Sequence, residues 1–185
     1  MKILLILLAA YLTGALPLHL WALGRPASHF TLYRREIFLV IVIDLVKGMA
    51  AALFGLALAG WMGACLAAVF VVVGSMYSVF QGFRGGYGLS VAAGALLILS
   101  PVLILFGIIV YFISLLATRY LFVSTLLTTI VMMIAGLVLA THFYALAVIL
   151  ITGGLILLRT RPDWRRFRRK IEPPYRFKNP FRRIH

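Results

Sequence analysis

The sequence predicts an all-α, polytopic membrane protein with about seven membrane-spanning helices. Hydrophobic residues make up 64% of the 185 residues, and charged residues only 12%. Apolar runs of about 20 residues, the length needed to cross the hydrocarbon core of a bilayer, fill most of the chain. These runs are continuous rather than alternating, which argues against a transmembrane β-barrel. We expect a transmembrane helical domain over residues 1–158 and a basic tail over residues 159–185.

The first expected span covers residues 3–23, with Gly14 and Pro17 near its end. A signal peptide is the alternative, but the apolar run continues to Leu23 and further spans follow. The next loop carries Arg25, Arg34 and Arg35, which place it on the cytoplasmic side by the positive-inside rule. The N-terminus is therefore expected outside. Ser28 and His29 are the nucleophile–base candidates of this loop, but adjacent residues rarely present that geometry.

The second and third spans are expected at residues 37–59 and 61–81. Asp44 and Lys47 lie inside the second span at i, i+3, on one helix face. Charges within a span are costly and usually face a polar interior. Two interpretations stay open: an ion pair that holds helices together, and a polar wall of a substrate cleft.

A glycine-rich segment, Gly74–Gly94, follows the third span. Gly82, Gly85, Gly86 and Gly88 surround Arg84. Glycines permit positive φ and can turn backbone N–H groups inward, so this concavity with its guanidinium suits a phosphate or another oxyanion. A new apolar segment begins directly afterwards, which adds a helix N-terminus to the same place. The alternative is a simple helix–helix turn with a cytoplasmic Arg.

Four further spans are expected at residues 89–100, 101–117, 121–140 and 142–158, with the break of the first two at Ser100–Pro101. Arg119 is an expected cytoplasmic anchor or support of the site, and His142 an interfacial hydrogen bonder. Seven segments that start outside put the tail inside. Eleven of the eighteen Lys and Arg residues lie in that tail, which agrees with this topology. Its basic and aromatic composition indicates binding to anionic lipid headgroups rather than to nucleic acid.

The Gly74–Gly94 segment resembles the second motif of the acyl-phosphate-dependent glycerol-3-phosphate acyltransferases of the PlsY type. That motif reads roughly G-H-x-F-P-x-F-x-x-F-K-G-G-K-G-V-A-T-x-x-G. Arg84 replaces its first Lys, whereas Ser75, Ser78 and Tyr87 replace its His, Pro and second Lys. The segments 11–17, 44–48 and 117–126 resemble other family segments, so the resemblance covers nearly the whole chain. The matching residues are Gly74, Phe80, Phe83, Gly85, Gly86, Gly88 and Gly94.

The tail resembles the third motif of the family, R-H-R-x-N-I-x-R-L-x-x-G-x-E. Thr160, Asp163 and Lys170 stand where the family has His, Asn and Gly. The Ser- and Gly-rich first motif, associated in the family with catalysis and acyl-phosphate binding, is absent between Pro17 and Asp44. Catalytic residues are therefore unassigned, because no intact catalytic set is present. The matching residues are Arg159, Arg161, Arg166 and Glu172.

The resemblance implies a multi-pass cell-membrane protein of phospholipid biosynthesis that transfers an acyl group from acyl phosphate to glycerol 3-phosphate. The alternative is a catalytically degenerate relative that binds phospholipid, another phosphate ligand or a partner enzyme. No cofactor is expected, and the single Cys65 excludes a multi-cysteine metal site. The expected substrate-binding residues are Arg84, Gly85, Gly86, Gly88, Asp44, Lys47, Arg34, Arg35, Arg159 and Glu172.

Overall fold

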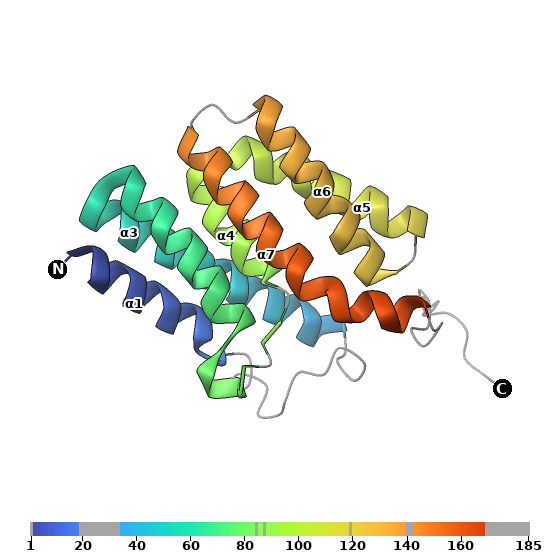
Figure 1. Cartoon of the computed structure of the whole chain (residues 1–185), viewed down its shortest axis with the longest axis horizontal. Coiled ribbons are helices and arrows are strands. Elements are labelled where there is room, and N and C mark those ends of the chain that lie inside the picture. Colours follow the sequence, from blue (N-terminus) through green and yellow to red (C-terminus); the bar gives the residue numbers. More distant parts are fainter. Residues whose placement is uncertain are drawn as a thin grey trace.

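The computed structural model describes residues 2–18, 34–83, 85–86, 88–118, 120–139 and 143–168. Within these ranges the regular structure is entirely helical (Figure 1). The prediction of an all-α polytopic membrane protein is confirmed. The elements in chain order are α1 (Lys2–Ala15), α3 (Arg34–Met76), the 3₁₀ turn η1 (Val79–Gln81), α4 (Leu89–Leu99), α5 (Pro101–Thr118), α6 (Leu121–Leu139) and α7 (Phe143–Arg168).

Helix α3 is a hairpin of two helical arms. Its backbone leaves the helical conformation at Ala59 and Gly60, and Gly60 has a left-handed φ of 63°, which glycine adopts without steric cost. The backbones of the two arms are in direct contact near this bend. Gly55 lies so close to Gly63 that a Cβ at Gly55 would clash with the carbonyl oxygen of Gly63. The bend lies between the two spans that the sequence predicts for this stretch.

Small residues bring the helices into backbone contact around α3. A Cβ at Gly14 of α1 would clash with the carbonyl oxygen of Val71, and one at Gly94 of α4 with that of Leu45. Gly74 and Gly48 make the reciprocal approaches to α1 and α4. Such close crossings are typical of membrane helices, whose association depends on packing rather than on the hydrophobic effect. The two arms of α3 therefore hold α1 on one side and α4 on the other.

Among the described residues, three stretches are long and apolar enough to cross a membrane: Phe38–Gln81, Pro101–Thr118 and Phe143–Thr160. The first contains the α3 hairpin, and shorter apolar helices cover Lys2–Ala15, Leu89–Leu99 and Val123–Val138. The helical conformation is interrupted between α4 and α5 at Ser100, whose backbone is extended, as expected before a proline. Helix α7 continues beyond Leu158 to Arg168, so the first part of the basic tail is helical.

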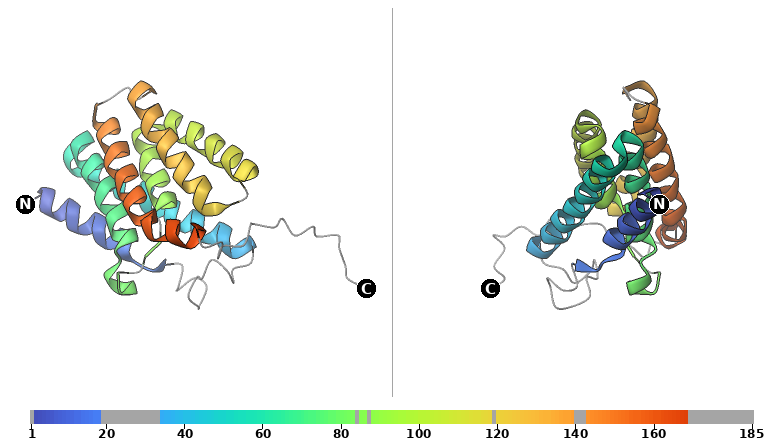
Figure 2. Two further views of the ribbon diagram at one scale, coloured as in Figure 1. Left: turned by 45° about the vertical axis from the view of Figure 1, so that its right-hand side comes forward. Right: turned by 90° about the vertical axis from the view of Figure 1, so that its left-hand side faces the viewer.

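The bundle has two distinct ends. At one end, the start of the second α3 arm, the end of α4 and the start of α7 surround a small cavity of about 110 Å³ lined by Trp61, Leu99, Tyr144 and Ala145. At the other end, the last residues of α1 lie beside the segment that joins α3 to α4, and α7 passes on towards its basic C-terminal part (Figures 1 and 2). We call the second end the basic end, because Arg34, Arg35, Arg159 and the later arginines of α7 lie there.

Candidate functional site

The C-terminus of α1 is held by a side chain of the α3–α4 connection and by one of the first arm of α3. Ser78, which is 1% exposed, donates a hydrogen bond of 2.6 Å from Oγ to the carbonyl oxygen of Ala15. Lys47 of α3, 4% exposed, donates one of 2.6 Å from Nζ to the carbonyl oxygen of Leu16. The last carbonyls of a helix have no partner within the helix, so these contacts satisfy groups that burial would otherwise penalise. A cation at a helix C-terminus also interacts favourably with the helix dipole.

Lys47 also forms an ion pair with Asp44, at 3.4 Å between Nζ and Oδ1. The pair lies on one face of α3, as the i, i+3 spacing predicts. Asp44 is the more exposed partner, with 22% of its side chain accessible. Lys47 therefore joins α3 to the end of α1, while Asp44 lies nearer to the accessible side. Of the two interpretations of these charges, the one in which they hold helices together agrees with the bond from Lys47 to Leu16.

The glycines of the turn that connects α3 to α4 occupy their positions for different structural reasons. Gly88 has a φ of 70° and immediately precedes α4, whose first turn has no side-chain cap. Gly82 has a φ of 58° and ends η1. A Cβ at Gly85 would clash with the carbonyl oxygen of Ser75, so Gly85 permits the turn to lie against the end of α3. A Cβ at Gly86, in contrast, would meet nothing within 4 Å.

Arg159 of α7 contacts the segment that connects α3 to α4. Its guanidinium donates a hydrogen bond of 3.1 Å to the carbonyl oxygen of Gly85 and lies 5.4 Å from the ring centroid of Tyr77. The backbone carbonyl of Tyr77 in turn accepts a hydrogen bond of 2.8 Å from the hydroxyl of Tyr11 in α1. A guanidinium has five N–H donors, and these contacts leave capacity for a further acceptor. Helices α1, α3 and α7 therefore converge on one turn.

Thr160 is the residue that the resemblance to the third family motif sets against its His. It is 1% exposed, and its hydroxyl bonds the carbonyl oxygens of Ile156 and Leu157 at 3.0 and 2.9 Å. A hydroxyl that donates to carbonyl oxygens of its own helix does not replace an imidazole as a general base. Arg161 and Arg166 continue in α7 beyond it.

The structure brings Gly85, Gly86, Gly88, Lys47 and Arg159 of the predicted set to one end of the bundle, with Asp44 beside Lys47. Arg34 and Arg35 begin the first arm of α3. Several predicted residues lie outside the described ones, among them Arg84 and Glu172 of the substrate-binding set and also Ser28, His29, Tyr87, Arg119 and His142. Within the part of the chain that the structure describes, no three His, Cys, Asp or Glu residues are grouped closely enough to hold a metal ion.

Sequence reasoning missed three contributors: Tyr11, Tyr77 and Ser78. Ser78 and Tyr77 lie in the segment that the sequence singles out, but neither residue type by itself indicates a long-range contact. The signal for Ser78 is its position next to a glycine-rich turn, where the resemblance to the second family motif sets it against a proline. The acceptors, Ala15 and Leu16, are backbone groups and carry no side-chain signal at all.

Comparison with known proteins identifies the relatives of this chain. The family model described as glycerol-3-phosphate acyltransferase matches residues 28–170. A glycerol-3-phosphate acyltransferase 2 of Bacillus cereus is 31% identical over 194 residues, covering 94% of this chain and 95% of the relative. Glycerol-3-phosphate acyltransferase 3 of Bacillus anthracis has the same identity and coverage.

Two solved structures share the fold. They are crystal structures of PlsY, an integral membrane glycerol 3-phosphate acyltransferase, in its lysophosphatidic acid and glycerol 3-phosphate forms. The TM-scores are 0.84 and 0.85, each at 25% sequence identity. The alignments cover 94% and 95% of this chain, and 95% and 96% of the respective PlsY chains.

Proposed function

Because this chain belongs to the glycerol-3-phosphate acyltransferase family, we propose that it is an integral membrane protein of phospholipid biosynthesis that transfers an acyl group to glycerol 3-phosphate. The acyl donor that the family resemblance implies is acyl phosphate. In the reaction, the acceptor hydroxyl attacks the acyl carbonyl, lysophosphatidate forms, and inorganic phosphate leaves. The donor is lipid-soluble and the acceptor is a water-soluble dianion, so the site must be accessible both from the membrane and from the aqueous phase.

The observation that carries this proposal is the convergence of Arg159 and the Gly85–Gly88 turn at the start of α4. Arg159 is bonded to Gly85, and α4 begins directly after Gly88 without a side-chain cap. A helix N-terminus with a guanidinium beside it favours a phosphate oxygen, or the oxyanion that develops at an acyl carbonyl. We propose that Arg84, Gly85, Gly86, Gly88 and Arg159 bind the phosphate, and that Asp44, Lys47, Arg34, Arg35 and Glu172 complete the surroundings.

A binding-only role is the second candidate, and Thr160 favours it. The family motif has a His at this position, whereas the Thr160 hydroxyl is buried and bonded to its own helix. A protein with an intact anion site but no general base would bind the phosphate-bearing ligand without turning it over.

Purified protein in detergent separates the two candidates. Acyl phosphate and glycerol 3-phosphate are added, and lysophosphatidate and released inorganic phosphate are quantified together. Equal amounts of both products, formed only with the two substrates present, support the acyltransferase. Binding of glycerol 3-phosphate without product supports the second candidate, and no binding of either ligand contradicts both.

The anion site itself is tested by Arg84→Ala. A charge-assisted contact to phosphate contributes about 1.5–3 kcal/mol, so the Kd for glycerol 3-phosphate should rise about 10- to 150-fold. Calorimetric titration measures this, and Lys2→Ala, a cation of α1 at the opposite end, is the matched control. An unchanged Kd for Arg84→Ala would show that the glycine-rich segment is a helix–helix turn and not an anion site.

We also propose the orientation, with the N-terminus outside and the basic end in the cytoplasm. Arg34, Arg35 and Arg159 lie at that end, whereas Lys2 lies at the other. A C-terminal reporter that fluoresces only in the cytoplasm should be active, and a periplasm-dependent phosphatase at the same place should not. The tail from Arg169 onwards would then adjoin the anionic lipid headgroups of the inner leaflet, each basic residue contributing about 1 kcal/mol of attraction.

A further inference from the structure

The turn between α3 and α4 exposes large apolar side chains at the basic end. Val79, Phe80 and Phe83 are 55%, 57% and 58% exposed. We call these three residues the apolar tip. Val79 and Phe80 lie in η1, at the end of the apolar stretch Phe38–Gln81, and Phe83 lies beyond it. Two positions after Phe83, the carbonyl oxygen of Gly85 accepts the hydrogen bond from Arg159. Exposed apolar groups of this size in a turn indicate a surface that another phase or molecule covers.

The apolar tip is presented by a fixed turn. The carbonyl oxygen of Ser78 accepts hydrogen bonds from the N–H groups of Gln81 at 3.2 Å and Phe83 at 2.9 Å, and the Ser78 hydroxyl is itself bonded to α1. Phe83 has a φ of 60°, which is disfavoured for a bulky residue. Such a backbone persists only where the surroundings determine it, so the outward position of the Phe83 side chain is built into the fold.

The lengths of the helices set the depth of this turn. Trp61 and Tyr144 line the same cavity at the opposite end, and Tyr77 and Arg159 meet at the basic end. At a rise of 1.5 Å per residue, these two levels are about 24 Å apart along α3 and about 22 Å along α7. The hydrocarbon core of a bilayer is about 30 Å thick. The α3 bend and the start of α7 mark the far end of the bundle. With that end at or beyond the far boundary of the hydrocarbon core, the turn lies no higher than the near boundary between acyl chains and headgroups, and helix tilt would lower it further.

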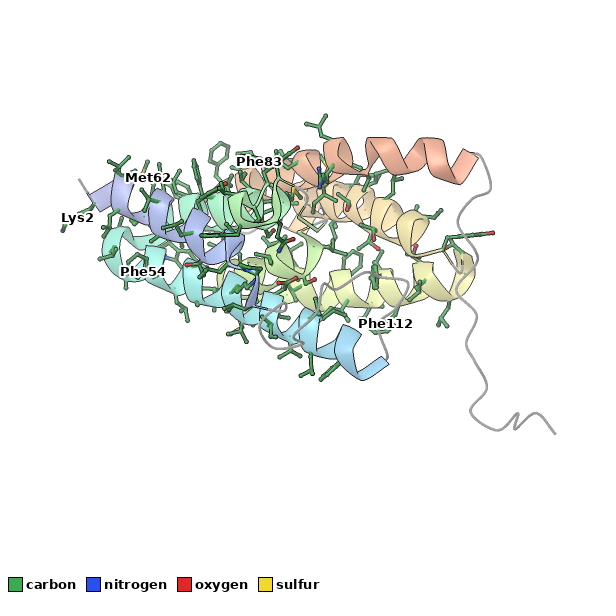
Figure 3. All side chains as sticks on the ribbon, turned by 90° about the horizontal axis from the view of Figure 1, so that it is seen from below. Lys2, Phe54, Met62, Phe83 and Phe112 are labelled. Atoms are coloured by element: carbon green, nitrogen blue, oxygen red, sulfur yellow. The ribbon has the colours of Figure 1, made fainter. Side chains whose placement is uncertain are left out.

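Other helices extend beyond this level. Helix α7 continues from Arg159 to Arg168, and the first arm of α3 begins at Arg34, ten positions before Asp44. Both extensions carry arginines, which suit the headgroup layer. The turn thus lies nearer to the membrane centre than the charged helix ends. Figure 3 labels Phe83 on this turn, Lys2, Phe54 and Met62 together at one end of the picture, and Phe112 of α5 towards the other.

From this arrangement we propose that the apolar tip inserts into the bilayer at the acyl–headgroup boundary of the leaflet on the basic side. The partner is the lipid surface, with apolar contact from Val79, Phe80 and Phe83 and anionic headgroups near the arginines. This inference does not depend on acyl transfer. It accounts for the apolar character of a turn that connects two helices at the charged end, where polar residues are usual.

The test uses single-cysteine proteins in which Cys65 is replaced by Ala and a cysteine is placed at Val79, Phe80 or Phe83. Each is labelled with an environment-sensitive fluorophore and reconstituted into phosphatidylcholine–phosphatidylglycerol vesicles. Nitroxide lipids with the spin label near the headgroup or near the chain terminus report depth, and aqueous iodide reports water access. Ile109, an exposed residue in the middle of α5, is the control for a deep position. Val79 and Phe80 do not have the left-handed backbone of Phe83, so they provide labelled sites if the Phe83 variant does not fold.

At the tip we expect blue-shifted emission and stronger quenching by the shallow nitroxide than by the deep one. At Ile109 the order should be reversed. Free quenching of the tip by iodide would overturn the proposal by placing the turn in water. Protection from both iodide and nitroxide lipids would also overturn it, because protein, either a second copy or another segment of this chain, would then cover the tip.

Discussion

Lys47 donates a hydrogen bond to the carbonyl oxygen of Leu16, 31 residues away in the sequence, and thereby ties the middle of one membrane helix to the end of another. The bond is 2.6 Å long and its ammonium group is buried. A charge inside a membrane protein is therefore used here to complete a helix terminus, with Asp44 as its counter-ion.

Lys47→Met should destabilise the protein by about 3 kcal/mol, because it leaves a buried carbonyl without a donor and Asp44 without its cation. The double variant Asp44→Asn, Lys47→Met should lose less, since the uncompensated carboxylate is then removed. Thermal unfolding in detergent, followed by size-exclusion chromatography, measures both. A double variant that is as unstable as the sum of the two single variants would contradict this account.

Ser78→Ala should cost about 1–3 kcal/mol, because the carbonyl of Ala15 is buried and loses the side-chain donor that caps it. The matched control is Ser75→Ala. The Ser75 hydroxyl bonds the carbonyl of Val72 within its own helix, so its loss should change stability by no more than about 0.5 kcal/mol. Equal melting temperatures of the two variants would show that the cap has no net effect.

Gly94→Ala should destabilise the bundle by about 1–3 kcal/mol, because the added methyl group would clash with the backbone of Leu45 and force α3 and α4 apart. Gly154→Ala is the control within α7, where a Cβ would meet nothing within 4 Å. That substitution should be neutral or stabilising by up to about 1 kcal/mol, since glycine is a poor helix former. Chemical unfolding of both variants in the same detergent tests the difference.

Much of the fold was accessible from the sequence because membrane helices leave a strong signal. The continuous apolar runs predicted an all-α polytopic protein, and Ser100–Pro101 indicated the break that separates α4 from α5. The spacing of Asp44 and Lys47 predicted a shared helix face, and the structure pairs them. The glycine-rich segment and its family resemblance pointed to the turn that precedes α4, and the family itself is confirmed.

The contacts that assemble the candidate site were not accessible in this way. Lys47 bonds the carbonyl of Leu16, directly after α1, and Ser78 bonds the one before it. No sequence pattern marks a backbone acceptor. The role of Gly85 in allowing backbone contact depends on how α3 ends, whereas Gly86 has open space around it. Both are glycines in one motif, and only the three-dimensional packing distinguishes them.

That difference gives a prediction for the two glycines. Gly85→Ala should lower the melting temperature, because its methyl group would clash with the carbonyl of Ser75. Gly86→Ala should leave it unchanged, and Gly86→Val should weaken glycerol 3-phosphate binding if the phosphate lies against this backbone. Melting curves and titrations on the same preparations separate folding from binding. A Gly86→Val protein that is stable and binds glycerol 3-phosphate normally would show that the phosphate does not lie against Gly86.

The contact of Arg159 with Tyr77 predicts a measurable coupling between α7 and the turn. The guanidinium lies 5.4 Å from the ring centroid and also bonds Gly85, so it uses both its charge and its planar shape. Arg159→Lys keeps the charge but loses the stacking geometry, and Tyr77→Leu removes the ring. A double-mutant cycle of these two changes should give a coupling of about 0.5–1 kcal/mol in the free energy of unfolding. Strict additivity would show that the stacking contributes nothing. Both variants should weaken glycerol 3-phosphate binding, because Arg159→Lys removes the guanidinium proposed to bind the phosphate and Tyr77→Leu removes the ring that orients it. If Arg159→Lys alone weakened binding, Tyr77 would serve only the packing of the turn.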